Sequence, residues 1–127
     1  MEKKPMILGL MWDYGSTHEL LESLKDYMDC FSVVYAPEID INFIEVNNGK
    51  SEFNPTMLCK YLESNDGEKC VAMVAGPLFE PLAIYMAAYS RSHNLNIPVL
   101  ILDGQGVDDI LTYTTGSELE SQIRNLL

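Results

Sequence analysis

Runs of apolar residues alternate with segments of helical periodicity along this chain, and this alternation constrains the fold more than any other feature. The run Met6–Trp12 is uninterrupted, and further apolar runs lie at 31–36, 70–75 and 97–102. Uninterrupted runs of this length are typical of strands buried on both faces of a sheet. Strands that alternate with helices favour a parallel sheet covered by helices. The 127 residues are the usual length of one domain, so we predict a single α/β domain over 1–127.

Local signals place the helices between these strands. We expect helices over about 17–29, from Asn54-Pro55 to about residue 64, from Glu80-Pro81 onward, and at the C-terminus from about residue 118. The sequences 16–19 and 117–120 have the pattern of capping boxes, with Ser16 and Ser117 as caps. Residues 41–46 are either an edge strand or loop, 107–111 one helical turn, and 112–114 a short fifth strand. The order predicts a three-layer, Rossmann- or flavodoxin-like fold with four or five mainly parallel strands.

Charge and cysteine content exclude several classes of function. Asp and Glu outnumber Lys and Arg by 19 to 8, a net charge of −11 that disfavours nucleic acid and anionic membranes as partners. No apolar stretch approaches the roughly 20 residues of a membrane span. The three cysteines and two histidines have no metal-ligand spacing, so we expect no metal site. Three unpaired thiols indicate a reducing compartment, and we expect a cytoplasmic protein.

The helix that follows Glu80 carries an unusual apolar segment. Residues 81–89 contain no charged side chain. A helix that is apolar all round is expected to be buried on all sides, which one small domain does not provide. We therefore expect a homo-oligomer formed through residues 81–93, the alternative being that the tyrosines tolerate partial exposure.

In open parallel sheets, ligands bind beyond the carboxyl ends of the strands. The residues that follow the predicted strands there are Trp12, Asp13, Tyr14, Gly15, Ser16 and Thr17, then Pro37, Glu38 and Asp40, then Gly76, Pro77, Leu78, Phe79 and Glu80, and finally Asp103, Gly104 and Gln105. No lysine or arginine lies at these exits, and the carboxylates there favour a cation or developing positive charge. Aromatic, hydroxyl and carboxylate groups together suit a nucleoside-like ligand. The alternative is that the acidic residues are ordinary turn residues.

The pattern of the whole chain resembles that of a known superfamily. The resemblance rests on the order of elements, on the exit Met11–Ser16 from the first strand, on Asn96–Leu102 and on Tyr113–Ile123. On these segments the chain resembles the nucleoside 2-deoxyribosyltransferase and nucleotide N-hydrolase superfamily, and the Toll/interleukin-receptor-like NAD-cleaving domains have a similar layout. Gly76-Pro77-Leu78-Phe79-Glu80 is similar to the G-T-A-F-E segment of that superfamily.

The resemblance implies a nucleotide-binding hydrolase or transferase that acts on an N-glycosidic bond. It implies Glu80 as the carboxylate that attacks or stabilises the sugar, because the transition state resembles an oxocarbenium ion. Asp13 or Asp103 would protonate or orient the leaving base. Trp12, Tyr14, Gly15, Ser16, Thr17, Gly76, Pro77, Phe79 and Gly104 would bind the nucleoside or nucleotide. Pro81-Leu82 after Glu80 departs from the family's Glu-x-Gly, and the alternative role of Glu80 is to complement the helix dipole.

Two other functions remain open. The segment 14–17 after the first strand also resembles the phosphate loop of the small flavodoxins, which would make FMN the cofactor and electron transfer the function. The other is a protein without catalysis that senses or sequesters a nucleotide or serves as an interaction module. If the protein acts on an N-glycosidic bond, or if it senses or sequesters a nucleotide without catalysis, we expect no cofactor.

Overall fold

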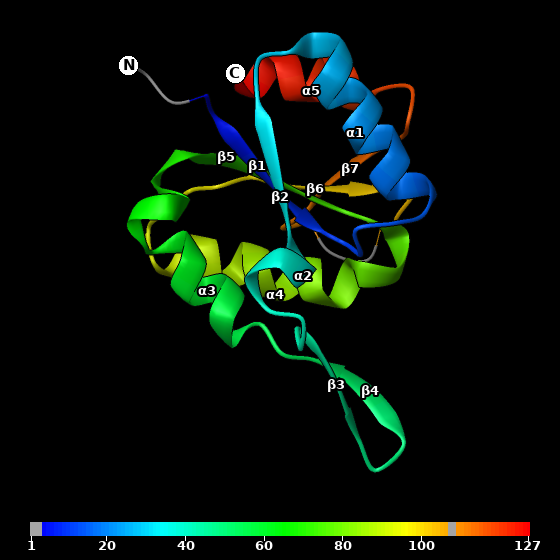
Figure 1. The fold of residues 1–127 in the computed structure, drawn as a ribbon, viewed down its shortest axis with the longest axis vertical. Coiled ribbons are helices and arrows are strands. Elements are labelled where there is room, and N and C mark those ends of the chain that lie inside the picture. Colours follow the sequence, from blue (N-terminus) through cyan, green and yellow to red (C-terminus); the bar gives the residue numbers. More distant parts are fainter. Residues whose placement is uncertain (1–3, 107–108) are drawn as a thin grey trace.

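A five-stranded parallel sheet forms the centre of the computed structural model, which describes residues 4–106 and 109–127 (Figure 1). Its order is β2-β1-β5-β6-β7, and each of the four neighbouring pairs is parallel. The strands are β1 (Met6–Leu10), β2 (Ser32–Tyr35), β5 (Cys70–Ala75), β6 (Val99–Leu102) and β7 (Thr112–Thr114). The predicted α/β class and parallel sheet are therefore confirmed.

The central strands are buried on both faces, as the apolar runs predicted. Every residue of β1 is buried, and five of the six residues of β5 are buried. The buried hydrophobic side chains form one contiguous core along these strands. The bounds of β5 and β7 agree with the predicted segments, whereas the other three strands are shorter than their apolar runs. Met11, for example, follows β1 and is still buried, because loop residues also contribute to the core.

Helices cover both faces of the sheet (Figure 1). The helices α1 (Ser16–Met28) and α5 (Leu119–Leu126) lie on one side, and α3 (Thr56–Leu62) and α4 (Glu80–Ser92) lie on the other. The four-residue α2 (Ala36–Ile39) follows β2, and short 3-10 turns occupy 65–69 and 77–79. Of the predicted helical turn 107–111, residues 107 and 108 lie outside the described residues. Within 4–106 and 109–127, none of these helices has the length and apolar character needed to cross a bilayer.

Both predicted capping boxes are wrong. The N-cap of α1 is Gly15 and that of α5 is Glu118, and no side chain caps either helix in the described part of the chain. Gly15 has φ 97°, a conformation that glycine adopts readily and that lets the chain turn sharply into α1. The turn at Gly15 makes Ser16 the first residue of the helix, so the Ser16 hydroxyl is not at the capping position.

The apolar helix α4 is not buried on all sides. Leu82, Ala83, Met86 and Ala87 are buried against the sheet, but Tyr85 is 51% exposed. The Tyr89 hydroxyl donates to the Glu63 carboxylate, and the Tyr89 ring stacks on His93. This helix thus has one core face and one face of small and aromatic side chains, and its role in assembly stays a prediction.

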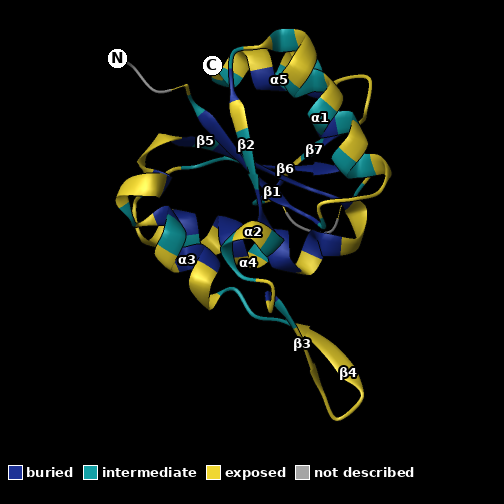
Figure 2. Ribbon diagram, in the orientation of Figure 1, coloured by how far each residue is buried: buried dark blue, intermediate teal, exposed yellow. Residues whose placement is uncertain are grey.

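A β-hairpin that the sequence analysis did not predict projects from the body of the protein (Figures 1 and 2). Its strands are β3 (Ile44–Asn47) and β4 (Lys50–Phe53), paired antiparallel across a turn in which Asn48 and Gly49 both have positive φ. Asn47-Asn48-Gly49 is a sequence typical of such a two-residue hairpin turn. The second strand was not predicted, because Lys50-Ser51-Glu52 does not alternate between apolar and polar residues.

The burial of two of the three cysteines gives a test of the core. Burial raises the pKa of the Cys59 thiol to about 11, with a smaller effect from Glu63, and raises the pKa of Cys70 to about 11. Only the thiolate attacks disulfide reagents. At about pH 8 we expect the half-buried Cys30 to react rapidly and the other two only on unfolding, which a colorimetric thiol assay measures. The Cys30→Ser variant should lose the fast phase; a second fast thiol in the folded protein would contradict this packing.

Candidate functional site

The carboxyl ends of β1 and β5 lie side by side, and the loops that follow them touch. β1 continues into Met11–Gly15 and then α1, whereas β5 continues into Gly76–Phe79 and then α4. A Cβ atom added to Gly76 would lie 3.4 Å from the Thr17 hydroxyl oxygen. This is an ordinary van der Waals distance, so the start of α1 lies directly against the second loop.

A cavity of about 270 Å³ opens between these two loops. Its walls are residues that the sequence analysis assigned to ligand binding, together with two that it did not. The lining consists of Trp12, Tyr14, Gly15, Ser16, Thr17, Gly76, Pro77 and Phe79, and of Met11 and Leu78. Met11 was assigned to the first strand and Leu78 was named only as a loop residue. The structure thus brings eight of the nine predicted ligand-binding residues to one cavity.

Three aromatic rings line this cavity, those of Trp12, Tyr14 and Phe79, and two further rings pack against them. The Trp12 and Tyr14 rings stack with centroids 6.0 Å apart and an interplanar angle of 13°. Trp12 also meets Phe43 edge-on at 4.8 Å. Phe79 contacts Phe43 at 6.1 Å and Phe53, at the base of the hairpin, at 5.8 Å. Neither Phe43 nor Phe53 was predicted to lie near the site: residues 41–46 could not be assigned to strand or loop from the sequence, and the strand that ends at Phe53 was not predicted.

Glu80 does not line the cavity. Its side chain is 5% exposed, and both carboxylate oxygens accept a hydrogen bond. The Gln105 backbone N–H donates to Oε1 at 2.9 Å, and the Tyr113 hydroxyl donates to Oε2 at 2.9 Å. Glu80 is also the first residue of α4, where the helix dipole favours a negative charge. This carboxylate therefore ties α4 to the β6–β7 side of the sheet.

The other predicted carboxylates, Asp13 and Asp103, do not line the cavity either. Asp13 is exposed on the loop after β1. Asp103 is exposed in a turn, with φ 51° and its backbone N–H bonded to the Thr114 carbonyl. Gly104 does not line the cavity, and a Cβ atom there would lie 2.9 Å from the Tyr113 ring. Gly104 therefore leaves room for the ring whose hydroxyl binds Glu80.

The carboxylates after β2 have local partners. Glu38 accepts a hydrogen bond from the Tyr35 N–H at 2.7 Å, and Asp40 accepts one from the Asn42 N–H at 2.9 Å. The Tyr35 hydroxyl donates to Glu22 at 2.8 Å, and burial together with this carboxylate raises the pKa of Tyr35. These hydrogen bonds stabilise the turn that follows β2 and connect β2 to α1. They agree with the alternative that such residues serve as turn residues.

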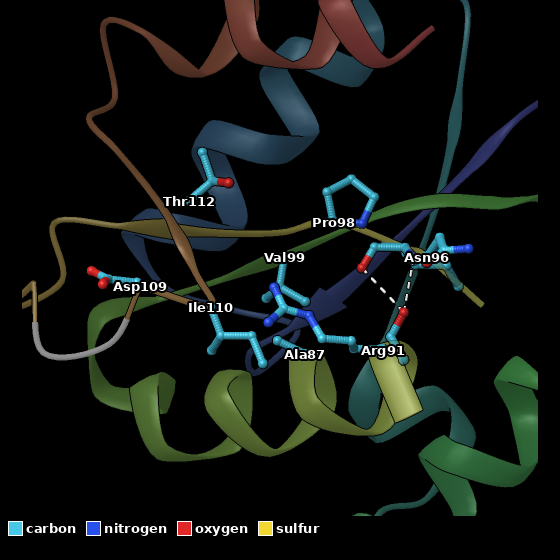
Figure 3. A pocket seen from close by; sticks show the side chains of 10 residues that line it. Ala87, Arg91, Asn96, Pro98, Val99, Asp109, Ile110 and Thr112 are labelled. Atoms are coloured by element: carbon cyan, nitrogen blue, oxygen red, sulfur yellow. Dashed lines mark hydrogen bonds between the residues drawn. The ribbon is translucent and has the colours of Figure 1, made fainter. Parts of the chain in front are cut away.

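A second cavity, of about 340 Å³, lies at the opposite end of the sheet (Figure 3). It is lined by the end of α4, by the starts of β6 and β7, and by the segments before these strands, with Arg91, Asn96 and Asp109 among its polar residues. The Ser90 hydroxyl closes one wall by bonding both backbone groups of Ile97. None of the predicted site residues reaches this cavity. Because ligands of parallel sheets bind at the carboxyl ends of strands, we take the first cavity as the candidate site.

The described residues include no group of three or more His, Cys, Asp or Glu side chains placed to hold a metal ion. The chain was compared with family models, with curated proteins and with solved structures, and no significant match was found in any of the three comparisons. The superfamily resemblance therefore stays a prediction from the sequence.

The two hydrogen bonds of Glu80 predict its effect on stability. In Glu80→Gln the amide oxygen can still accept from the Gln105 N–H and the amide N–H can donate to the Tyr113 hydroxyl, but both buried bonds lose the extra strength that a carboxylate acceptor gives them. We expect the free energy of unfolding to fall by about 1–3 kcal/mol, measured by chemical denaturation. The exposed Glu68→Gln serves as the control and should not change it. An unchanged stability of Glu80→Gln would show that the carboxylate does not brace the fold.

Proposed function

We propose that the protein binds a nucleoside or mononucleotide in the cavity between the β1 and β5 loops, with the base stacked on Trp12 and Tyr14. The observation that carries this proposal is the aromatic wall of the 270 Å³ cavity at the junction of the two loops. Pockets for drug-sized ligands span roughly 300–1,000 Å³, so this cavity suits a base or nucleoside better than a dinucleotide.

The polar groups at the mouth of the cavity fit the sugar side of such a ligand. Ser16 and Thr17 supply hydroxyls in the first turn of α1, and no side chain among the described residues caps the free N–H groups of that turn. These N–H groups can donate hydrogen bonds to one phosphate, so no basic residue is needed to bind it. The net charge of −11 opposes further phosphates. A nucleoside or a monophosphate is therefore favoured over a triphosphate.

The position of Glu80 supports binding without cleavage. A carboxylate that attacks or stabilises a sugar must reach it, but this one is 5% exposed and both its oxygens are engaged. We accordingly propose the sensing or sequestering role rather than that of an N-glycosidase. Release of free base from a nucleoside, a deoxynucleotide or NAD by the pure protein would contradict this choice.

FMN binding is the second candidate, because one observation favours it. Counting only the strands of the main sheet, the order is 2-1-3-4-5, that of the flavodoxin-like folds, and the cavity lies at the switch point where they bind FMN. The flavin with its ribityl phosphate is larger than a nucleoside, and this small cavity fits it less well. Addition of FMN distinguishes the two: a bound flavin gives visible absorbance, and a protein that ignores FMN excludes this candidate.

The proposal predicts how binding depends on Tyr14. Stacking of a base on an aromatic side chain contributes about 1–3 kcal/mol, so Tyr14→Ala should weaken nucleoside binding by about 5- to 150-fold. Tyr14 is 67% exposed, and its loss should leave the fold intact. Calorimetric titration with each common nucleoside and its 5′-phosphates measures the effect, and emission from Trp12, the only tryptophan, reports it independently.

Two variants act as controls for this measurement. Tyr27 is 72% exposed elsewhere on α1, so Tyr27→Ala should bind like the wild type. Glu80→Gln should also bind with unchanged affinity, because Glu80 does not line the cavity. The proposal is wrong if the wild type binds no nucleoside or nucleotide, or if Tyr14→Ala and Tyr27→Ala behave alike.

A further inference from the structure

The β3–β4 hairpin projects from the body of the protein and has no core of its own (Figures 1 and 2). Residues 45–52 are all exposed, and Val46 is 71% exposed. Phe43 and Phe53 hold only the base of the hairpin, through Trp12 and Phe79. An isolated two-stranded hairpin is marginally stable in water. The projecting part of this hairpin thus lacks the packing that stabilises other strands.

The outer edge of β4 is open for pairing. β4 pairs with β3 alone among the described strands. The two-residue turn Asn48-Gly49 closes on the pair Asn47 and Lys50, and hydrogen-bonded and non-bonded pairs then alternate along the ladder. The N–H and C=O of Ser51 therefore point away from β3. They form an unused donor and acceptor at the middle of the strand.

The charges on the hairpin are unbalanced within one copy. Glu45 and Glu52 are directly opposite each other in the ladder, and like charges in that position are destabilising. The Asn54 amide donates to Glu45 at 2.8 Å. Lys50 forms no ion pair within the described residues, although Glu52 lies on the same face of its own strand. A cation opposite Glu52 would relieve the repulsion.

We propose that two copies of this chain pair through the β4 edges, antiparallel about a two-fold axis at Ser51. This register lets the two Ser51 residues exchange backbone hydrogen bonds. It also places Lys50 of each copy opposite Glu52 of the other, so one self-complementary surface forms two ion pairs. The hairpin holds the bodies apart, and salt screens their negative charges beyond about 8 Å at physiological ionic strength. The small contact gives a dimer whose population depends on concentration.

Charge exchange on the full chain tests this pairing. Lys50→Glu places four carboxylates along the joint, and Glu52→Lys places four lysines there. Each variant alone should sediment as the 14.3 kDa monomer at concentrations where the wild type has twice that mass. An equimolar mixture of the two should recover dimers, because every facing pair is then of opposite charge, and native mass spectrometry should identify them as mixed dimers.

Controls separate the pairing from general charge and from folding. Lys60→Glu and Glu68→Lys make the same charge changes at exposed positions outside the hairpin and should dimerise like the wild type. In Glu52→Lys the new lysine faces Glu45 within the hairpin, so the hairpin itself is strengthened and unfolding does not explain a monomer. The proposal is overturned if the wild type stays monomeric up to its solubility limit. It is equally overturned if the hairpin variants dimerise like the wild type, a result that would favour α4 as the dimer interface.

Discussion

The backbone polar groups of β1 and β5 have no water to bond, and the rest of the structure depends on this constraint. Both strands are buried on both faces, so their N–H and C=O groups are satisfied by neighbouring strands. The neighbours are parallel, and every strand therefore ends at the same edge of the sheet. The two central strands place the Trp12–Thr17 and Gly76–Phe79 loops next to each other. The candidate site is a direct result of how the core satisfies its hydrogen bonds.

Glu80 also stabilises the structure, although a buried carboxylate without partners would be costly. Burial of an ion requires partners, and Glu80 obtains one backbone N–H and one hydroxyl rather than a cation. Gly104 allows this arrangement, because any side chain there would collide with the Tyr113 ring. The carboxylate thereby connects α4, the loop after β6 and β7. A residue whose neighbourhood suggested chemistry instead holds these three elements together.

The sequence predicted the parts of the structure that local patterns determine. Strands β5 and β7 have the predicted bounds, and the glycines and aromatic residues after β1 and β5 do meet around one cavity. Three other features of the structure were not predicted from the sequence. Gly15 stands at the N-cap position where Ser16 was expected, and the hairpin strand Lys50–Phe53 carries no apolar alternation. The burial of Glu80 depends on Tyr113, which is 33 residues away, and no local pattern encodes such a contact.

The central claim is that the cavity between the β1 and β5 loops is the binding site, and a residue-resolved map tests it most directly. Amide resonances recorded by NMR during titration with a nucleoside locate the ligand without relying on any variant. We predict saturable shifts of the amide resonances of Gly15–Thr17, Gly76, Leu78 and Phe79, with residues of the second cavity such as Arg91 and Asn96 unmoved. Shifts confined to the second cavity, or no saturable shift with any nucleoside or its monophosphate, would contradict the account.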